Sequence, residues 1–276
     1  MSPPAELKYF IVDAFTSVPF AGNPAAVVPL EAWPADAWLQ NLAREMNLSE
    51  TAFIVPISTG YELRWFTPTV EVDLCGHATL ATAKILAHLE QLPDGGEVSF
   101  STRSGILKTA RFGEELQLDF PSQPATPTSA PLGLSPSLGI TPLYVGFNGS
   151  DYLVEVESEQ QVRSLTPDFK HLAQVPCRGV MVTARSSEPQ FDFVSRFFAP
   201  RAGIDEDPVT GSAHCCLGPY WGEKLQKQSL TGHQVSSRGG IVHVTLVPDR
   251  ILLRGSAVIV ASGTFTPPIL SALSYS

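Results

Sequence analysis

Two expected helix starts carry the residues with the clearest chemical potential in this sequence. Gly76 precedes His77 and Gly211 precedes Ser212, and each pair opens an apolar run long enough for a helix. The first backbone N–H groups of a helix lack internal partners and carry the positive end of its dipole, and a glycine lets an anion approach them. The pair predicts one cleft that binds a carboxylate or phosphate. The alternative is that each glycine only makes a tight strand-to-helix turn.

Three side chains near these starts are candidates for moving protons. His77 falls in the first turn of its helix, where the dipole disfavours the imidazolium and predicts a neutral imidazole. Asp207 lies four residues before Gly211 and either reaches the same cleft or caps the helix. Glu50 stands in NLSETAF beside apolar residues, where partial desolvation suits a carboxylate to proton transfer, although Asn47 and Glu50 also have the spacing of a capping pair.

A cysteine at the first helix start is a further candidate. Cys75 precedes Gly76 and could act as a nucleophile or base if the helix start favoured its thiolate. Its counterpart in the second half is Thr210, whose hydroxyl is far too weakly acidic to replace a thiolate. The sequence holds no GxGxxG, GxxxxGK[ST], HExxH or GxSxG motif and no Cys/His spacing typical of zinc. We therefore expect acid–base chemistry by side chains, with no metal and no cofactor.

Matching phrases indicate that the two helix starts belong to an internal duplication. RWFTP (64–68) and RFFAP (196–200) each come shortly before a helix start. STRSGILK (101–108) and SSRGGIVH (236–243) each place a glycine 29 residues after the helix-start glycine. Three matched phrases in one order predict two similar domains that face each other, since two copies are too few for a solenoid.

The composition supplies a boundary between the copies. Residues 121–142 contain six of the 24 prolines, which is typical of a semi-rigid connector. We therefore expect a first domain over residues 1–120, a Pro-rich linker over 121–142 and a second domain over 143–276. Within the domains, residues 77–89 and 212–226 are apolar on almost every side, as in a helix enclosed by other structure. Pro219 predicts a kink or an early break in the second of these helices.

The bulk properties restrict the class of protein. With 276 residues, 43% hydrophobic and 16% charged, the chain can bury a real core. A formal charge of −9 argues against a nucleic-acid surface. The N-terminal segment lacks the features of a signal peptide, and no apolar run reaches the length of about 18 residues that suggests a membrane span. Four cysteines without framework spacing predict free thiols and a cytoplasmic location.

The motifs NLSETAF, RWFTP, LCGHATLA and EDPVTGSAH, in that order, resemble the PhzF-like family. The resemblance covers nearly the whole chain, and it is especially close to the vertebrate members, the phenazine biosynthesis-like domain-containing or MAWD-binding proteins. It implies the α+β diaminopimelate-epimerase-like fold. In that fold two similar domains, each a β-barrel-like sheet around a central helix, place the active site between them.

The resemblance also implies a cofactor-free isomerase. In PhzF a glutamate moves a proton between carbons of a dihydro-hydroxyanthranilic acid, an aspartate and a histidine assist, and backbone amides and a serine hold the substrate. The matching positions are Glu50 for the proton carrier, His77 and Asp207 for the assistants, and Gly76, Gly211 and Ser212 for the substrate-holding turns. Because animals make no phenazines, we expect a different small carboxylate, cyclic or unsaturated, as the substrate.

Two alternatives stay open at this stage. Related racemases and epimerases use two thiols. Here Cys75 matches the first of these positions, but the second is Thr210, which disfavours that chemistry. The chain could also be a non-catalytic scaffold that keeps the pocket, with a MAWD-type WD-repeat protein as the partner that the resemblance implies. A homodimer is the default expectation for a protein of this kind.

Overall fold

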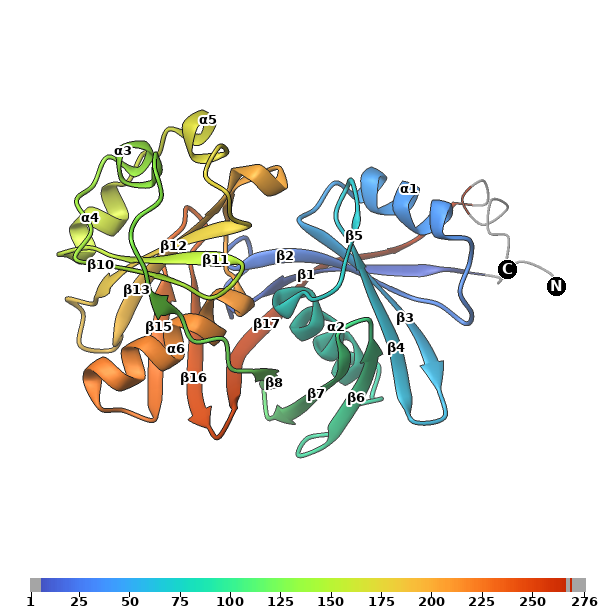
Figure 1. Cartoon of the computed structure of the whole chain (residues 1–276). Coiled ribbons are helices and arrows are strands. Elements are labelled where there is room, and N and C mark those ends of the chain that lie inside the picture. The colour runs from blue at the N-terminus through green and yellow to red at the C-terminus, as the bar shows by residue number, and fades with distance from the viewer. Residues whose placement is uncertain (1–5, 267–268, 270–276) are drawn as a thin grey trace. The chain divides into compact units, whose positions relative to one another are not determined.

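The computed structural model describes residues 6–266 and Ile269, and the chain divides into two compact units (Figure 1). The first unit combines the chain up to Asp119 with the part from Arg254 onward, and the second holds the residues between. The chain leaves the first unit within β8 (Glu115–Pro121) and returns to it within β17 (Arg250–Thr264). Both units mix strands with helices, as expected for an α+β fold.

The first unit surrounds one buried helix with strands. Its further elements are β1 (Lys8–Ala14), β2 (Asn23–Pro29), α1 (Asp36–Met46), β3 (Glu50–Ile57), β4 (Gly60–Phe66), β5 (Glu71–Val72), α2 (Gly76–His88), β6 (Glu97–Thr102) and β7 (Gly105–Phe112). Helix α2 contacts β1, β2, β3 and β7, and Figure 1 shows it in teal against these strands. Helix α1 packs Trp38, Leu39 and Leu42 into a separate apolar cluster that includes Phe53 of β3.

Two buried threonines of helix α2 satisfy their hydroxyl groups within the helix. The Thr79 hydroxyl donates to the carbonyl of Cys75 at 2.5 Å, and the Thr82 hydroxyl donates to the carbonyl of Ala78 at 2.8 Å. These bonds remove the cost of burying unpaired hydroxyl groups. The prediction of an enclosed helix at this point in the chain is confirmed.

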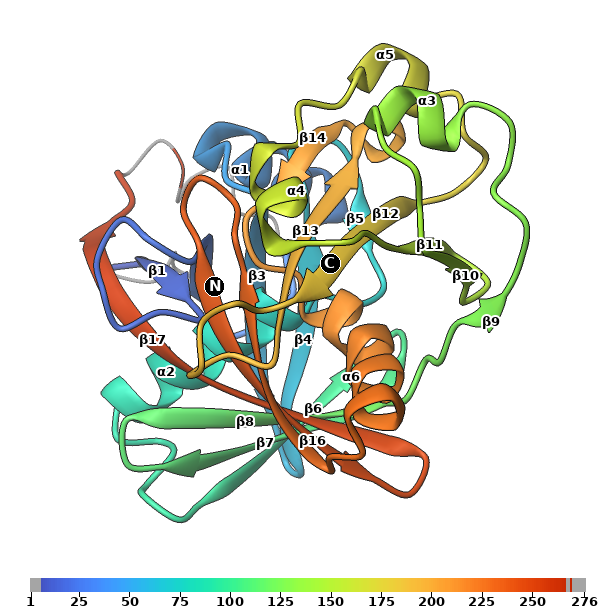
Figure 2. The ribbon, with the colours of Figure 1, turned by 90° about the vertical axis from the view of Figure 1, so that its left-hand side faces the viewer.

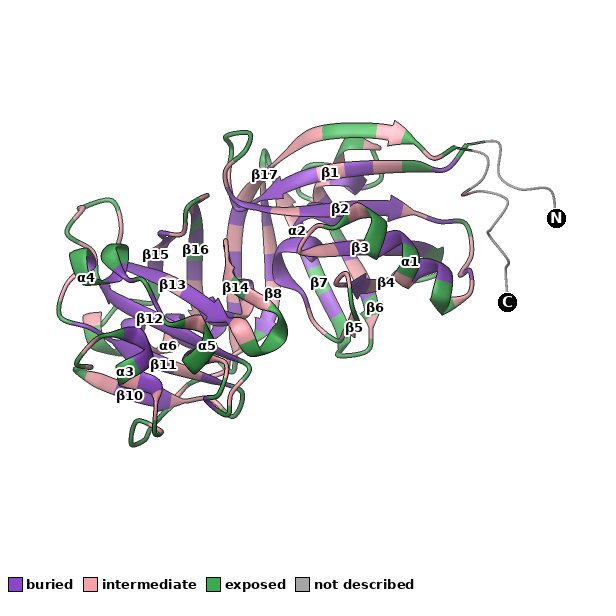
Figure 3. Cartoon of the chain, turned by 90° about the horizontal axis from the view of Figure 1, so that it is seen from above, coloured by how far each residue is buried: buried purple, intermediate pink, exposed green. Residues whose placement is uncertain are grey.

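The second unit has the same plan. Its elements are β9 (Thr126–Pro127), α3 (Leu134–Leu138), β10 (Tyr144–Phe147), β11 (Asp151–Glu155), α4 (Glu159–Ser164), α5 (Phe169–Leu172), β12 (Gly179–Arg185), β13 (Phe193–Ala199), the short 3-10 helix η1 (Pro200–Ala202), β14 (Ile204–Asp207), α6 (Gly211–Leu225), β15 (Ser229–Gln234) and β16 (Gly240–Val247). Helix α6 lies along β15 and β16, which Figure 2 shows for β16. Figure 3 shows β12 and β13 almost wholly buried.

Strand pairing repeats between the units and bears out the duplication. In the first unit β1–β2, β3–β4 and β6–β7 pair antiparallel, whereas β2–β3 and β4–β6 pair parallel. In the second unit β10–β11, β12–β13 and β15–β16 pair antiparallel, whereas β11–β12 and β13–β15 pair parallel. The glycines of the matched phrases begin equivalent elements, α2 and β7 in one unit and α6 and β16 in the other.

Pro219 does not end its helix, so of the two predicted outcomes, a kink or an early break, the break is wrong. Helix α6 runs from Gly211 to Leu225 with the proline inside it. A proline cannot donate to the carbonyl four residues earlier, which is that of Cys215. The backbone N–H of Gln123 donates to this carbonyl instead, at 3.1 Å. The helix therefore continues because a neighbouring segment satisfies the group that proline leaves unpaired.

The division of the chain differs from the expected one at two places. Residues 121–142 hold β9 and α3, and β9 pairs with β10, so this stretch belongs to the second unit rather than forming a linker. From Arg254 onward β17 pairs with β1 in the first unit, because one long strand continues across the boundary. The start of the N-terminal segment and most of the last ten residues lie outside the described residues. Within the described part of the chain, no helix is long and apolar enough to cross a membrane.

Candidate active site

Glu50, which is partly buried, and His77, which is buried, form a pair at the start of α2. Glu50 is the first residue of β3, and His77 lies in the first turn of the helix. Oε2 of Glu50 lies 3.0 Å from Nε2 of His77, with 13% and 5% of the two side chains exposed. The structure therefore brings together two of the three predicted proton carriers, next to the predicted substrate-holding residue Gly76.

A third polar side chain, Asn23, holds the other side of the imidazole. β2 and β3 run parallel, so the first residue of β2, Asn23, comes close to the start of β3. Its Nδ2 lies 3.0 Å from Nδ1 of His77. An amide nitrogen only donates, so Nδ1 accepts and the ring hydrogen of a neutral imidazole sits on Nε2, the nitrogen 3.0 Å from Oε2 of Glu50. Our sequence reasoning missed Asn23.

The turn before Asn23 is a signal that could have revealed it. Gly22 has a φ of 65°, and a Cβ there would lie 2.3 Å from the carbonyl oxygen of Ala14. Only glycine fits this close approach. The asparagine that follows is fully buried at the start of a strand, and a buried amide needs polar partners.

The carboxylate changes the expected charge of His77. Burial lowers the pKa of His77, but the charge of a Cys75 thiolate and that of Glu50 raise it, and the net direction is well above the ordinary value. Since Cys75 is a thiol near neutral pH, Glu50 is the group that favours the imidazolium there. The Glu50 carboxylate, 3.0 Å away, therefore works against the neutral imidazole that the helix dipole predicts. A doubly protonated ring requires the Asn23 amide to present its oxygen to Nδ1.

Cys75 is the residue before α2, and it is a thiol rather than a thiolate. Its Sγ lies 3.6 Å from Nδ1 of His77. Burial first, and the nearby Glu50 charge second, raise the pKa of Cys75 to about 11. Thr210 occupies the same position before α6, as the duplication predicted. The site therefore lacks the pair of activated thiols that two-base epimerisation uses.

The same three side chains offer donor atoms for a metal. Each of these residues, Glu50, Cys75 and His77, offers one ligand atom, and the three atoms lie within 4.8 Å of one another. In a tetrahedral zinc site, neighbouring ligand atoms are about 3.3–3.8 Å apart. The 3.0 Å separation between Glu50 and His77 is instead that of two groups in direct contact. The geometry thus suits a proton-sharing pair better than a ligand set.

The start of α6 carries the other predicted residues. Asp207 ends β14, and its Oδ2 accepts a hydrogen bond from the Thr210 hydroxyl at 2.5 Å. The side chain of Gln234 fixes this turn, because its Nε2 donates to the carbonyl of Asp207 at 2.7 Å and its Oε1 accepts from the N–H of Thr210 at 2.8 Å. Gly211 and Ser212 follow as the first two residues of the helix. The structure thus places these three predicted residues at one turn.

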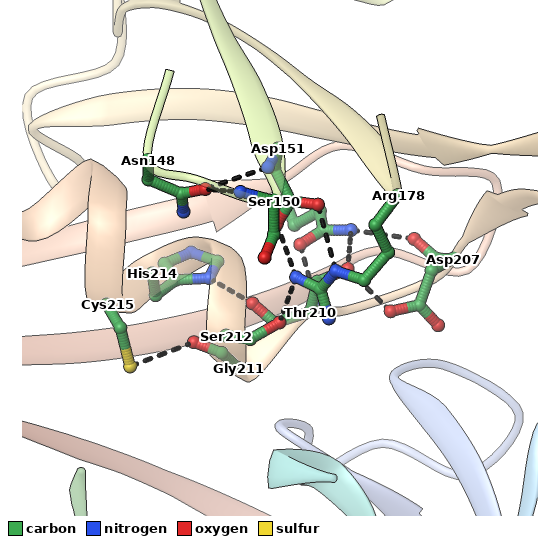
Figure 4. Close-up of polar contacts among 11 residues, drawn as sticks. Asn148, Ser150, Asp151, Arg178, Asp207, Thr210, Gly211, Ser212, His214 and Cys215 are labelled. Carbon is green, nitrogen blue, oxygen red and sulfur yellow. Dashed lines mark hydrogen bonds and ion pairs between the residues drawn. The ribbon is translucent and has the colours of Figure 1, made fainter. Parts of the chain in front are cut away.

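Two charged residues beside this turn were not predicted. Arg178 donates from Nε to Oδ1 of Asp151 at 2.9 Å, Nη2 contacts Oδ2, and Nη2 also donates to Oγ of Ser212 at 3.1 Å (Figure 4). His214, one turn into the helix, faces the carbonyl of Thr210 through Nδ1 at 2.9 Å. Burial lowers the pKa of His214 to about 4, so this histidine stays neutral near physiological pH.

Neither helix start is capped by a side chain. The residues before α2 and α6, Cys75 and Thr210, make no side-chain hydrogen bond to the first N–H groups of their helices. Each unit therefore combines a helix start that keeps its anion-binding capacity with ionisable side chains beside it. In the first unit these side chains form an acid–base pair, which is the arrangement of an enzyme that moves protons.

Comparisons with known proteins identify the family. The model of the PhzC-PhzF family, phenazine biosynthesis-like protein, matches residues 12–263. An uncharacterized isomerase of Halalkalibacterium halodurans is 53% identical over 252 residues, which cover 91% of this chain and 95% of that protein. An uncharacterized isomerase of Pseudomonas aeruginosa is 51% identical over 260 residues, with coverage of 94% and 98%. The chain belongs to the phenazine biosynthesis-like PhzC-PhzF family, and within it the chain is an isomerase.

Solved structures agree with this assignment. A PhzF-family protein from Enterococcus faecalis superposes with a TM-score of 0.90 at 41% identity, covering 95% of this chain and 99% of that one. A probable proline racemase from Agrobacterium radiobacter shares the fold alone, with a TM-score of 0.64 at 10% identity. The expected special closeness to vertebrate members is wrong, because a mouse phenazine biosynthesis-like domain-containing protein is 41% identical, less than the bacterial isomerases.

Proposed function

We propose that this protein is a cofactor-independent isomerase that moves a proton between two carbons of a small carboxylate, cyclic or unsaturated. Glu50 carries the proton, His77 and Asp207 assist, and Gly76, Gly211 and Ser212 hold the substrate's carboxylate. The observation that carries the proposal is the 3.0 Å contact between the Glu50 carboxylate and the His77 imidazole in a buried setting. Such a pair has one group that accepts a proton and one that balances the charge.

The proton transfer can be written with these groups. Glu50 takes a proton from a carbon next to the substrate's unsaturation, so a C–H bond breaks and an O–H bond forms. The electron pair stays on the substrate and spreads into its conjugated system. When His77 is an imidazolium, its positive charge remains after Glu50 is neutralised and stabilises the developing negative charge. Glu50 then returns the proton to a second carbon, which completes the isomerisation with no external oxidant or reductant.

The helix starts support the proposed grip on the carboxylate. The first N–H groups of α2 and α6 receive no side-chain cap from Cys75 or Thr210. An anion that accepts from such groups is stabilised by both hydrogen bonds and the helix dipole. The hydroxyl of Ser212, in the first turn of α6, adds a side-chain donor.

Epimerisation by two thiols has less support. The pKa of Cys75 is raised to about 11 by burial, so its thiolate is rare near neutral pH. Its counterpart is a threonine whose hydroxyl already donates to Asp207. A single carboxylate that takes and returns one proton requires neither thiol.

The proposal is tested with a panel of candidate substrates. The dihydro-hydroxyanthranilic acid of phenazine biosynthesis and a series of cyclic unsaturated carboxylates are incubated with wild type, Glu50→Gln and Glu97→Gln, and isomers are separated by chromatography. We expect Glu50→Gln to lower turnover by roughly 10²–10⁴-fold. Glu97→Gln is the matched control, since Glu97 is an exposed glutamate of the same unit that pairs with Lys108. Equal turnover by Glu50→Gln, or no isomerisation of any panel member by wild type, contradicts the proposal.

A further inference from the structure

Arg178 lies one residue before the position in the second unit, Gly179, that corresponds in strand register to Glu50 in the first. Glu50 begins β3 and follows Asn23, the first residue of β2, by 27 residues. Arg178 comes directly before β12 and follows Asp151, the first residue of β11, by the same 27 residues. Both strand pairs are parallel, and both charged residues contact the second residue of the enclosed helix. The start of α6 therefore has a cation beside the second residue of its helix, where the start of α2 has the proposed catalytic carboxylate.

The guanidinium of Arg178 is fixed on one side and open on the other. Nε and Nη2 both contact the Asp151 carboxylate, which is fully buried. The guanidinium also lies 5.7 Å from the ring centre of Phe197. In the part of the chain that the structure describes, Nη1 donates to no protein acceptor, and 44% of the side chain is exposed. A rigidly held guanidinium with free donors is a geometry suited to binding an anion.

Arg178 also sets the direction of the Ser212 hydroxyl. Nη2 donates to Oγ of Ser212 at 3.1 Å, and a guanidinium cannot accept. The hydroxyl hydrogen of Ser212 therefore has to point to another acceptor. Ser212 lies in the first turn of α6, so this hydrogen, Nη1 of Arg178 and the first N–H groups of the helix are donors gathered at one place (Figure 4).

We propose that Arg178 binds the anionic group of the substrate through Nη1 and orients the Ser212 hydroxyl toward the same group, with Asp151 as its positioning residue. This inference rests on the proposed function, since it takes the ligand to be a carboxylate. Burial lowers the pKa of Arg178, whereas the charges of Asp151 and Asp207 raise it, and the net direction is upward. The negative charge of Asp207 therefore lies close to Arg178 and opposes the binding of an anion there. The donors at the start of α6 offset this repulsion.

The test measures equilibrium binding and needs no turnover. Benzoate, bicarbonate and the uncharged analogue benzamide are titrated into the full-length protein by calorimetry. Removing Arg178 alone leaves the buried Asp151 charge unpaired and could unfold the unit, so the main variant is Asp151→Asn/Arg178→Gln, which removes both charges. Arg178→Lys keeps the positive charge but loses the two-pronged guanidinium contact with Asp151. Arg185→Gln, at the far end of the same strand β12, is the matched control, and circular dichroism verifies that each variant folds.

We expect the double variant to bind benzoate about 10- to 100-fold more weakly than wild type, as for the loss of charge-assisted hydrogen bonds. The benzoate affinity of Arg178→Lys should lie between those of wild type and the double variant, and that of Arg185→Gln should equal that of wild type. The affinity for benzamide should not depend on Arg178. Unchanged benzoate affinity in a folded double variant, or no binding of either anion to wild type, overturns the inference. Arg178-dependent binding without Glu50-dependent turnover instead contradicts only the proposed function.

Discussion

The starts of α2 and α6 are built alike and carry opposite charges. At α2 a carboxylate, Glu50, meets His77, and Asn23 supports the imidazole. At α6 a guanidinium, Arg178, meets Ser212, and Asp151 supports the guanidinium. The same strand order thus brings a charged side chain to the second helical residue in both units, although Arg178 lies one residue before the counterpart of Glu50. The side chains placed there decide whether a start is suited to moving protons or to holding an anion.

The largest effect on this comparison, after loss of Glu50 itself, comes from the residue that balances its charge. His77→Gln keeps a donor near Glu50 but removes the group that can become a cation. We expect turnover to fall by about 10²-fold. The control is His88→Gln at the other end of α2, which should leave turnover within about 3-fold. If His77→Gln keeps wild-type turnover, then the imidazole takes no part in the reaction. The assignment of proton transfer to the start of α2 would then lose its support.

The same residue predicts a pH-dependent stability. The pKa of His77 in the folded protein is raised above its ordinary value of about 6.5. Its contribution is therefore fully present below about pH 6.5 and is lost as the pH rises through the raised value. Chemical denaturation of wild type and His77→Gln should show a difference in unfolding free energy of about 1–3 kcal/mol at pH 6. The difference should shrink at alkaline pH, and a difference that grows with pH contradicts the assigned charge.

Asp207 sharpens the comparison because it belongs to the anion-holding start but is assigned an acid–base role. Asp207→Asn removes both its charge and its proton-carrying capacity. We expect turnover to fall by about 10- to 100-fold. Benzoate affinity should rise by roughly 2- to 5-fold, because a repulsive charge near Arg178 is gone. Calorimetry and turnover on one preparation separate the two effects, and a parallel loss of both would make Asp207 a simple binding residue.

Cys75 should give the smallest effect. Its thiol is buried and protonated, and Glu50 and His77 contact each other without it. Cys75→Ala should therefore retain turnover within about 3-fold, since no bond in the proposed transfer involves sulfur. A loss of 10²-fold or more would favour the epimerase-type chemistry that a threonine at the counterpart position disfavours. Deuterium exchange at a stereocentre of the substrate is the measurement that detects such chemistry.

Local sequence signals predicted the helix starts, but they do not say which side chains meet across the sheet. Gly76 and Gly211 stand at the beginning of apolar runs, so their helices follow from local pattern, and Glu50 lies beside an expected strand. Asn23 and Arg178 act through contacts with residues 54 and 34 positions away, which depend on which strands run parallel. The duplication does not reveal these residues either, because in strand register Glu50 corresponds to Gly179 and Ala25 corresponds to Asp151.

Two errors about the fold have the same origin. Pro219 leaves the carbonyl of Cys215 without a donor from the helix, as expected for a proline. The backbone N–H of Gln123, from a distant part of the sequence, donates to this carbonyl instead. The end of the chain was assigned to the second domain because β17 follows β16, whereas the strand continues into pairing with β1. Contacts between residues far apart in the sequence determine both features, and a single sequence does not show these contacts.

The most direct test of the central claim follows hydrogen at carbon. A panel substrate that wild type isomerises is incubated in deuterium oxide, and mass spectrometry with proton NMR locates deuterium in product and recovered substrate. If Glu50 carries the proton, wild type exchanges or transfers hydrogen only at the two carbons of the isomerisation, and Glu50→Gln shows neither exchange nor transfer while still binding benzoate. Exchange at these carbons at the wild-type rate in Glu50→Gln would show that another group carries the proton.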